Sequence, residues 1–335
     1  MAARSQAAFR RPVPLPQSSL AAEVIAGLTA KPKRIPPKYF YDEAGAQLFE
    51  AITATPEYYL TRCEMAILHK YASEIARFIP AGGALVEFGS GSSKKARILL
   101  DAASGIAAYV PVDISAEMLL SEAQDLRRDQ PQFVVLPVEA DFTRPFTLPP
   151  EVERLPHAGF FPGSTIGNFE PHEACAFLRH AGRMLGDRST LIIGVDLVKD
   201  AGILNAAYND AAGITAKFNF NLLTRINREL GAAFDPASFS HHAFFNSGRH
   251  RIEMHLASKK RQKVSVAGRS IEFRSGETIH TENSYKYTLA SFAALARGSG
   301  WTPISAWTDP DGKFSVHALI FTDGVTAARQ PLTGE

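Results

Sequence analysis

Residues 85–95, Leu85-Val86-Glu87-Phe88-Gly89-Ser90-Gly91-Ser92-Ser93-Lys94-Lys95, decide the fold of this chain. An apolar run ends in an acid and two glycines, and an apolar pattern at helical spacing follows over residues 96–100. This order predicts a strand, a tight turn and a helix, the opening unit of a nucleotide-binding α/β sheet. Gly89 and Gly91 lack a Cβ atom and therefore allow a sharp turn and the close approach of a ligand.

The spacing of these glycines argues against a dinucleotide. Dinucleotide sites use G-x-G-x-x-G, in which the last glycine allows close packing of helix on strand. Here Lys94 stands at that position, and a lysine cannot do this. An acid before a G-x-G turn without the third glycine is similar to the S-adenosylmethionine (SAM) loop of class I methyltransferases. A glycine-rich turn that binds no ligand is the alternative.

Composition excludes several classes of protein. The 335 residues are 45% hydrophobic with a formal net charge of +2, which supports a sizeable core and argues against a nucleic-acid or membrane partner. No apolar run reaches the roughly 18–20 residues of a membrane span. Two cysteines, Cys63 and Cys175, are too few for a disulfide framework or a zinc site. We expect a cytoplasmic protein, monomeric, that binds neither nucleic acid nor membranes.

Strands and helices alternate through the first two thirds of the chain. Expected strands lie at 85–88, 109–113, 133–138, 159–163 and 190–196, with helices between them, which predicts a parallel, doubly wound sheet. Such sheets bind ligands at the carboxyl ends of their strands. Polar or aromatic candidates follow those ends: Glu87, Asp113 for ribose hydroxyls, Asp141 and Phe142 for an adenine, and the loop from Gly163 to Asn168.

This alternation then stops and later resumes. Residues 214–230 carry one apolar stripe of a helix, and residues 241–274 alternate as in an antiparallel meander. Two further strands, 301–307 and 314–321, form a closing hairpin, as in class I methyltransferases. We therefore expect an α/β, Rossmann-like SAM methyltransferase sheet over 62–198 and 286–322. An α+β substrate-recognition domain would comprise 20–61 and 199–285, after a disordered tail over 1–19.

Aromatic residues gather between residues 39 and 59, around three prolines. One interpretation is a clamp that packs an N-terminal arm on the body of the protein. The other is the wall of a pocket, since tyrosine offers both apolar area and a hydrogen bond.

Several segments together resemble the histidine Nα-methyltransferases of ergothioneine biosynthesis. They are 37–42, 56–62, 87–95, 163–168, 195–200, 251–254 and 281–284, and the resemblance extends from about residue 20 to residue 322. Its most specific motifs are G-S-T-I-G-N, D-L-V-K-D and P-E-Y-Y-x-T-R. The resemblance implies that SAM methylates the α-amino group of L-histidine three times, giving hercynine, and that no metal takes part.

The resemblance also implies site residues. The cofactor positions are Glu87, Gly89, Gly91, Lys95, Asp113, Asp141 and Phe142. The substrate positions are Asn168 and Tyr208 for the carboxylate, Glu282 and Ser284 for the imidazole, Tyr58 and Met254 beside it, and Phe49 near the amine. Tyr41 and Gly163 match positions at the reacting amine, so they are the expected catalytic residues. The sequence departs slightly from the pattern, with Tyr39 where tryptophan is common and Asn283 between Glu282 and Ser284.

The spacing of Glu282 and Ser284 suits histidine. In an extended segment, residues two apart share a face, and a carboxylate with a hydroxyl can bind both imidazole nitrogens. Indole has one N–H and would leave a buried group unpaired, which argues against tryptophan as substrate. Two further alternatives are a nicotinamide oxidoreductase and a SAM-binding protein without activity. His241-His242 suggests a metal, but no third ligand is evident in the sequence.

Overall fold

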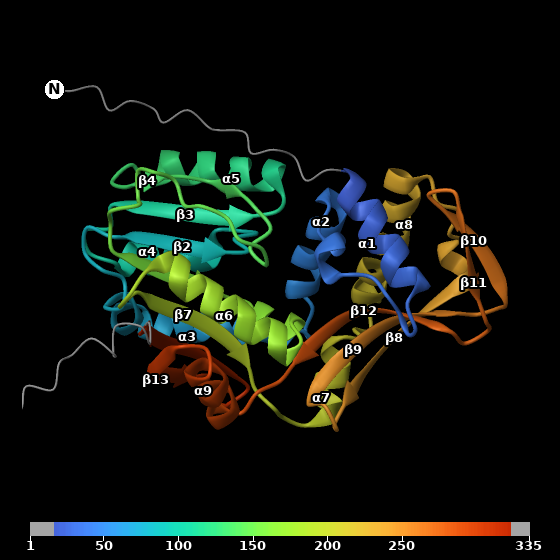
Figure 1. Ribbon diagram of the computed structural model, residues 1–335. Helices are drawn as coiled ribbons and strands as arrows, with labels where there is room; N and C mark the ends of the chain where they lie inside the picture. The colour runs from blue at the N-terminus through green and yellow to red at the C-terminus, as the bar shows by residue number, and fades with distance from the viewer. Residues whose placement is uncertain (1–16, 323–335) are drawn as a thin grey trace, which may run out of the picture.

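The computed structural model describes residues 17–322 and contains one large sheet with a smaller one beside it (Figure 1). The strands of the large sheet are β2 (Ala84–Phe88), β3 (Ala108–Asp113), β4 (Val134–Val135), β5 (Val138–Glu139), β6 (His157–Phe161), β7 (Thr190–Asp196), β13 (Trp301–Thr308) and β14 (Phe314–Phe321). They run in the order β13-β14-β7-β6-β2-β3-β4, and β5 also pairs with β3. β14 pairs antiparallel with both of its neighbours, β7 and its hairpin partner β13. The other strand pairs of this sheet are parallel. This is the class I methyltransferase sheet that the sequence predicted.

Helices cover both faces of the large sheet. They are α3 (Tyr59–Ala76), α4 (Lys94–Ala102) and α5 (Ala116–Asp129) on one face, and α6 (Pro171–Leu185) and α9 (Leu289–Arg297) on the other. Because side chains alternate along a strand, Leu85 packs into the first layer and Val86 into the second. Both are fully buried, as in a parallel sheet covered on both sides.

The second sheet has the order β1-β12-β9-β8. Its strands are β1 (Lys33–Arg34), β8 (Phe239–Asn246), β9 (Arg251–Ser258) and β12 (Thr278–Tyr285), and a separate hairpin joins β10 (Gln262–Val266) to β11 (Arg269–Phe273). The helices of this region are α1 (Gln17–Thr29), α2 (Glu43–Thr53), α7 (Ala201–Ala207) and α8 (Ile214–Leu230), with short 3-10 turns at η1 (Pro37–Phe40) and η3 (Pro236–Ser238). The core under α3 and α4 continues without interruption into α8 and β9.

Two sequence expectations differ from the structure. The strand expected over 133–138 is two short strands, because Pro137 between them has no N–H to donate to a ladder. Of the tail expected over 1–19, residues 1–16 lie outside the described residues, and Gln17 already begins α1. The helix satisfies backbone groups that a disordered tail would leave to water.

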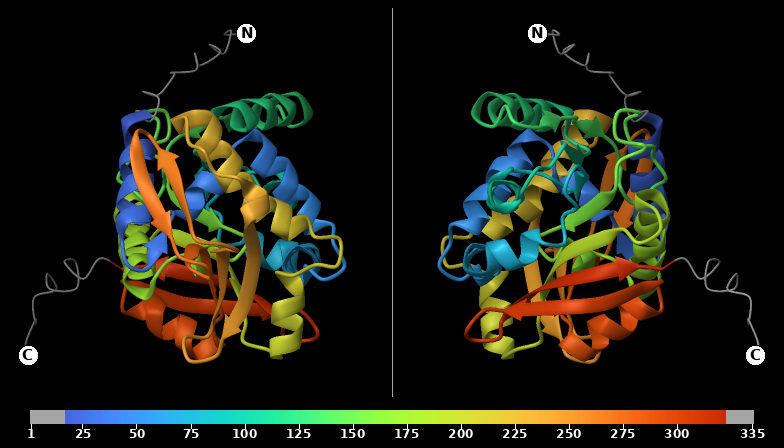
Figure 2. Two further views of the ribbon diagram at one scale, coloured as in Figure 1. Left: turned by 90° about the vertical axis from the view of Figure 1, so that its right-hand side faces the viewer. Right: turned by 90° about the vertical axis from the view of Figure 1, so that its left-hand side faces the viewer.

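The architecture brings the ends of the large sheet to the second sheet. The arrows of β2 and β3 point toward α2 and the second sheet (Figure 1). The 3-10 turn η2 (Thr165–Asn168), which follows β6, packs against β12; a Cβ atom added at Gly167 would lie 2.8 Å from the carbonyl oxygen of Tyr285. Figure 2 shows the molecule from the side of the second sheet (left) and from the side of the large sheet (right). Within residues 17–322, no helix is long and apolar enough to cross a membrane.

Candidate active site

The glycine turn after β2 has the geometry of a ligand cradle. Gly89 has φ +72°, and a Cβ atom added there would lie 3.3 Å from the ring of Phe142. The N–H of Gly91 donates to the Asp113 carboxylate at 3.1 Å. The predicted cofactor residues from β2, β3 and the loop after β5 therefore meet at one place.

Two features of this cradle bear on the ligand that it could hold. Glu87 is fully buried, and burial raises its pKa to about 8; Tyr109 donates to one of its oxygens, while Oε1 has no partner among the described residues. A cavity of about 200 Å³ lies beside Asp141, the residue predicted to bind the adenine. Its lining residues are Ile114, Glu139, Ala140, Asp141, Arg144, Pro145 and Phe146. A turn with glycines at two positions, two carboxyl groups for hydroxyl groups and a partly apolar slot would suit an adenosine.

Lys95 and Gly163 are joined by a residue that the sequence analysis did not single out. Glu64, buried in α3, accepts the N–H of Gly163 at 2.9 Å and pairs with Lys95 Nζ at 2.7 Å. The cofactor helix α4 and the loop after β6 are thus tied to the same carboxylate. A signal did exist, because Glu64 lies on the apolar stripe of α3 between Leu60 and Leu68.

The predicted aromatic residues form a row rather than a separate clamp. Ring centroids lie 5.7 Å apart for Tyr41 and Phe49, 6.2 Å for Phe49 and Tyr58, and 6.2 Å for Tyr58 and Tyr208. Phe218 of α8, which the sequence analysis assigned only to a helix stripe, contacts both Tyr41 and Phe49. The row runs from the N-terminal arm to Tyr208, the residue that follows α7.

The residues predicted to bind the imidazole, Glu282 and Ser284, lie at the other end of this row. Glu282 and Ser284 are both buried on β12, and Met254 faces Glu282 across the ladder. The hydroxyl of Tyr208 donates to Ser284 Oγ at 2.7 Å. Burial raises the pKa of Glu282 to about 8, against the lowering effect of the Lys286 charge. Glu282 is therefore a buried acid poised to exchange its proton near neutral pH.

Tyr41 lies where the two halves of the site meet. Burial raises its pKa well above the ordinary value, and the charges of Glu282 and Asp113 raise it further. Burial likewise raises the pKa of Tyr58 and of Tyr208. All three phenols remain protonated at physiological pH, so they serve as hydrogen-bond partners and not as phenolate bases.

Asn168, predicted to bind the substrate carboxylate, lies on the methyltransferase side. It is the last residue of η2 and is half-buried. Ser164, at the start of the same loop, is held in the left-handed region at φ 56° and accepts the backbone N–H of Asp196 at 2.9 Å. The end of β7 thus holds the loop after β6, which carries Gly163 and Asn168.

A buried ion cluster beneath the site was not predicted. The Asp196 carboxylate contacts Lys286 at 2.6 Å and Lys199 at 2.6 Å, and Tyr59 donates to it at 2.8 Å. Lys286 and Asp196 have no exposed side-chain surface. No local pattern in the sequence reveals this cluster, because its members come from α3, the end of β7 and the end of β12.

The structure gathers Glu253, His255 and His280 as a possible metal-ligand group, where the sequence had suggested His241 and His242. The two rings stack 4.7 Å apart at 18°, and nearly parallel rings do not aim both lone pairs at one point. The Arg251 guanidinium already pairs with Glu253 at 2.8 Å. The simpler interpretation of this group is an Arg251–Glu253 ion pair with two stacked imidazole rings beside it.

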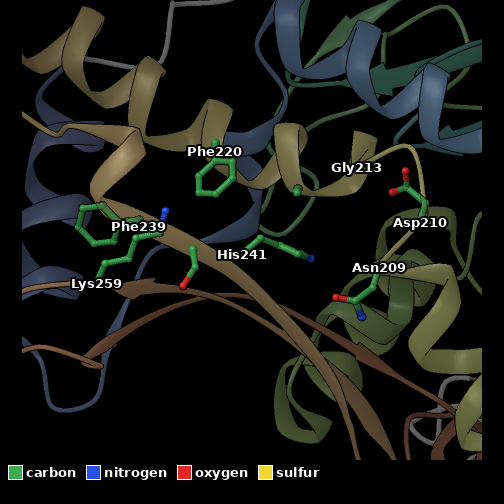
Figure 3. A pocket seen from close by; sticks show the side chains of 9 residues that line it. Asn209, Asp210, Gly213, Phe220, Phe239, His241 and Lys259 are labelled. Atoms are coloured by element: carbon green, nitrogen blue, oxygen red, sulfur yellow. The ribbon is translucent and has the colours of Figure 1, made fainter.

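A cavity of about 380 Å³ opens between α8 and β8, outside the candidate site (Figure 3). Its lining residues include Asp210, Phe220, Phe239, His241 and Lys259. His241 Nε2 lies 2.9 Å from the carbonyl oxygen of Tyr208, so the cavity lies behind the pocket wall. None of the predicted site residues lines it.

Comparisons with known proteins identify relatives of this chain. The chain is 42% identical over 313 residues to the histidine N-alpha-methyltransferase of Mycolicibacterium smegmatis, covering 90% of this chain and 95% of that protein. It is 31% identical over 310 residues to ergothioneine biosynthesis protein 1 of Neurospora crassa, covering 86% of this chain and 33% of that protein. The 4-dimethylallyltryptophan N-methyltransferase of Claviceps purpurea is 29% identical over 204 residues, covering 57% of this chain and 59% of that protein. A family model described as a histidine-specific, SAM-dependent methyltransferase matches residues 20–320, and the chain belongs to that family.

Proposed function

We propose that this chain transfers three methyl groups from SAM to the α-amino group of L-histidine and so forms hercynine for ergothioneine biosynthesis. Family membership and the identity to histidine N-alpha-methyltransferases support the reaction. The observation in the structure that carries the proposal is the buried pair Glu282 and Ser284, facing the same aromatic row as Tyr41.

SAM supplies an electrophilic methyl group, and the chain must present a neutral amine to it in line. A free α-amino group has a pKa of about 8, so it is largely protonated at pH 7 and must lose a proton before each transfer. We assign Tyr41 and the backbone of Gly163 to orienting the amine. Tyr41 stays neutral because its pKa is raised, so it can accept from an amine N–H without becoming charged.

Aromatic faces suit the product as well as the substrate. Each methylation makes the amine larger and more apolar, and the third fixes its positive charge. Phe49 and Tyr41 pack edge to face, so a methylated ammonium beside them meets aromatic surface, worth roughly 0.5–2 kcal/mol by cation–π attraction. This surface also excludes water from the transfer.

Substrate recognition divides between two groups. Asn168 and Tyr208 are assigned to the carboxylate of histidine, and Glu282 with Ser284 to the imidazole, with Tyr58 and Met254 lining the ring. Cofactor contacts fall to Glu87, Gly89, Gly91, Lys95, Asp113, Asp141 and Phe142. We assign SAM binding to residues 62–198 and 286–322, and substrate recognition to residues 20–61 and 199–285.

A second candidate substrate is tryptophan or a derivative of it. A relative of lower identity carries the name of a dimethylallyltryptophan N-methyltransferase. Against it stands Glu282, whose buried carboxyl would be left without a partner by the far edge of an indole. We therefore favour histidine.

The test is to incubate the purified protein with histidine and SAM and to follow the product by mass spectrometry and proton NMR. Three added methyl groups, all on the α-nitrogen, are expected, with three S-adenosylhomocysteine molecules formed per hercynine. Methylation at a ring nitrogen, or accumulation of a monomethyl product, would contradict the proposal.

A further inference from the structure

Lys286 lies directly beneath the proposed substrate pocket and has no exposed side-chain surface. It follows β12, two residues after Ser284. Its ammonium contacts the Asp196 carboxylate at 2.6 Å, which stabilises a charge that burial alone would disfavour. None of the roles assigned above uses this lysine.

The contacts of Lys286 reach two substrate residues at once. Its Nζ atom donates to Ser284 Oγ at 2.7 Å and to Tyr208 Oη at 3.3 Å. Tyr208 also donates to Ser284 Oγ at 2.7 Å. An ammonium can only donate, so both hydroxyl oxygens must act as acceptors toward it.

This arrangement leaves one direction for the hydroxyl hydrogen of Ser284. A serine oxygen has two acceptor sites and one hydrogen. Lys286 and Tyr208 occupy the two acceptor sites, so the O–H must point away from both. Glu282 and Ser284 lie two residues apart on β12 and so share one face of the sheet, and we infer that the O–H points to that face.

We propose that Lys286 is a positioning residue that turns the Ser284 hydroxyl into a donor, so that the pocket selects one neutral tautomer of the imidazole. Ser284 donates to the ring nitrogen that carries a lone pair, and an oxygen of the Glu282 carboxyl group accepts from the nitrogen that carries hydrogen. A ring without that lone pair leaves a buried O–H unpaired. This inference rests on the proposed function, since it concerns the same pocket.

A purely structural role for Lys286 is the competing explanation, and Lys199 provides a matched control. Lys199 also contacts Asp196 at 2.6 Å and is nearly as buried. Its hydrogen bonds within the described residues go to Tyr59, Asp196 and the carbonyl of Leu197, and not to Ser284 or Tyr208. Loss of either lysine weakens the ion cluster, but only loss of Lys286 frees the Ser284 hydroxyl.

The experiment compares Lys286→Met and Lys199→Met in steady-state kinetics. We expect Lys286→Met to raise KM for histidine about 30-fold with kcat within about threefold, because the lysine acts on ring binding and not on the amine. Lys199→Met should leave KM within about threefold. The affinity for SAM should be unchanged in both.

Ring analogues give the sharper measurement. The two pyrrolylalanines each keep one ring N–H and replace the other nitrogen by C–H. Wild-type protein should prefer histidine over the better pyrrolylalanine by at least about 100-fold in kcat/KM. In Lys286→Met the Ser284 hydrogen can turn back toward Tyr208, so the preference should shrink at least about tenfold. In Lys199→Met it should not change.

An unchanged preference in Lys286→Met, or an equal change in both variants, would overturn the proposal. If Lys286→Met does not fold, the double variant Lys286→Met with Asp196→Asn removes both buried charges and is held to the same expectations. If wild-type protein methylates histidine but Lys286→Met keeps the same preference for histidine over the pyrrolylalanines, only the role of Lys286 is contradicted. No turnover of histidine by wild-type protein would defeat the proposed function and this inference with it.

Discussion

The cofactor cradle and the substrate pocket differ in how their residues come together. Glu87, Gly89 and Gly91 lie within five residues on one strand and turn. The pocket instead joins Tyr41, Tyr58, Tyr208 and Glu282 from four elements far apart in the sequence. The cradle is a local structure that many chains can form, whereas the pocket exists only when the second sheet has docked on the first. The difference teaches that the cofactor cradle depends on neighbouring residues in the sequence, whereas the substrate pocket depends on the tertiary fold.

The largest expected effect is on the substrate side. Glu282→Ala removes the only carboxylate assigned to the ring, and we expect kcat/KM for histidine to fall roughly 100- to 1,000-fold. SAM affinity, measured by calorimetry, should stay the same, because the two regions bind their ligands through separate residues. Unchanged histidine affinity in this variant would sink the assignment of Glu282.

A substitution in the cofactor cradle should weaken the binding of SAM. Gly89→Ala places a Cβ atom 3.3 Å from the Phe142 ring at φ +72°. Strain of roughly 1–3 kcal/mol should weaken SAM binding about 10- to 100-fold, measured by calorimetry. The control is Gly82→Ala, which has φ +70° and nothing within 4 Å of the added atom. Equal losses in the two variants would show that backbone strain alone matters, and not the approach to the ligand.

How much could be predicted from sequence follows the same division. Strand, acid, glycine turn and helix spacing identified the cradle, because each signal lies within a few residues. The parallel sheet followed from the alternation of strands and helices, and the closing hairpin from the two apolar runs at 301–307 and 314–321. Lys286 and Asp196 could not be found, since a buried ion pair between residues 90 positions apart leaves no periodic trace. The roles in the pocket came from resemblance alone.

A smaller effect is expected at Asn168, where the large sheet contributes a residue to substrate binding. If Asn168 holds the carboxylate, wild-type protein should use histidine at least about tenfold better than histidinamide. Asn168→Ala should lose most of that preference, as measured by the ratio of kcat/KM values. Equal use of acid and amide by wild-type protein would remove Asn168 from the proposed site.

The smallest effect concerns stability and pH. The pKa of Glu282 is raised from 4.5 to about 8 by burial, so between those values the folded protein binds more protons than the unfolded chain. Its contribution to stability is therefore lost as pH rises through this window. Glu282→Gln lacks this loss, so the Tm of the variant minus the Tm of wild type should increase from pH 5 to pH 8, as measured by scanning calorimetry.

The exposed Glu272→Gln, on β11, provides the matched control for that measurement. Its Tm difference from wild type should not grow over the same range, because the Lys263 ammonium holds the pKa of its carboxyl below 4.5 and the group is largely ionised in both states above pH 5. A constant difference for Glu282→Gln as well would mean that Glu282 is ionised in the empty pocket at neutral pH.

The central claim is that the docked second sheet makes this methyltransferase specific for histidine. It is tested most directly by incubating the protein and SAM with each of the twenty amino acids and weighing the products by mass spectrometry. We predict that histidine alone gains three methyl groups. Trimethylation of tryptophan, or of several amino acids alike, would leave the cofactor cradle in place but contradict the assignment of Glu282 and Ser284 as readers of the imidazole.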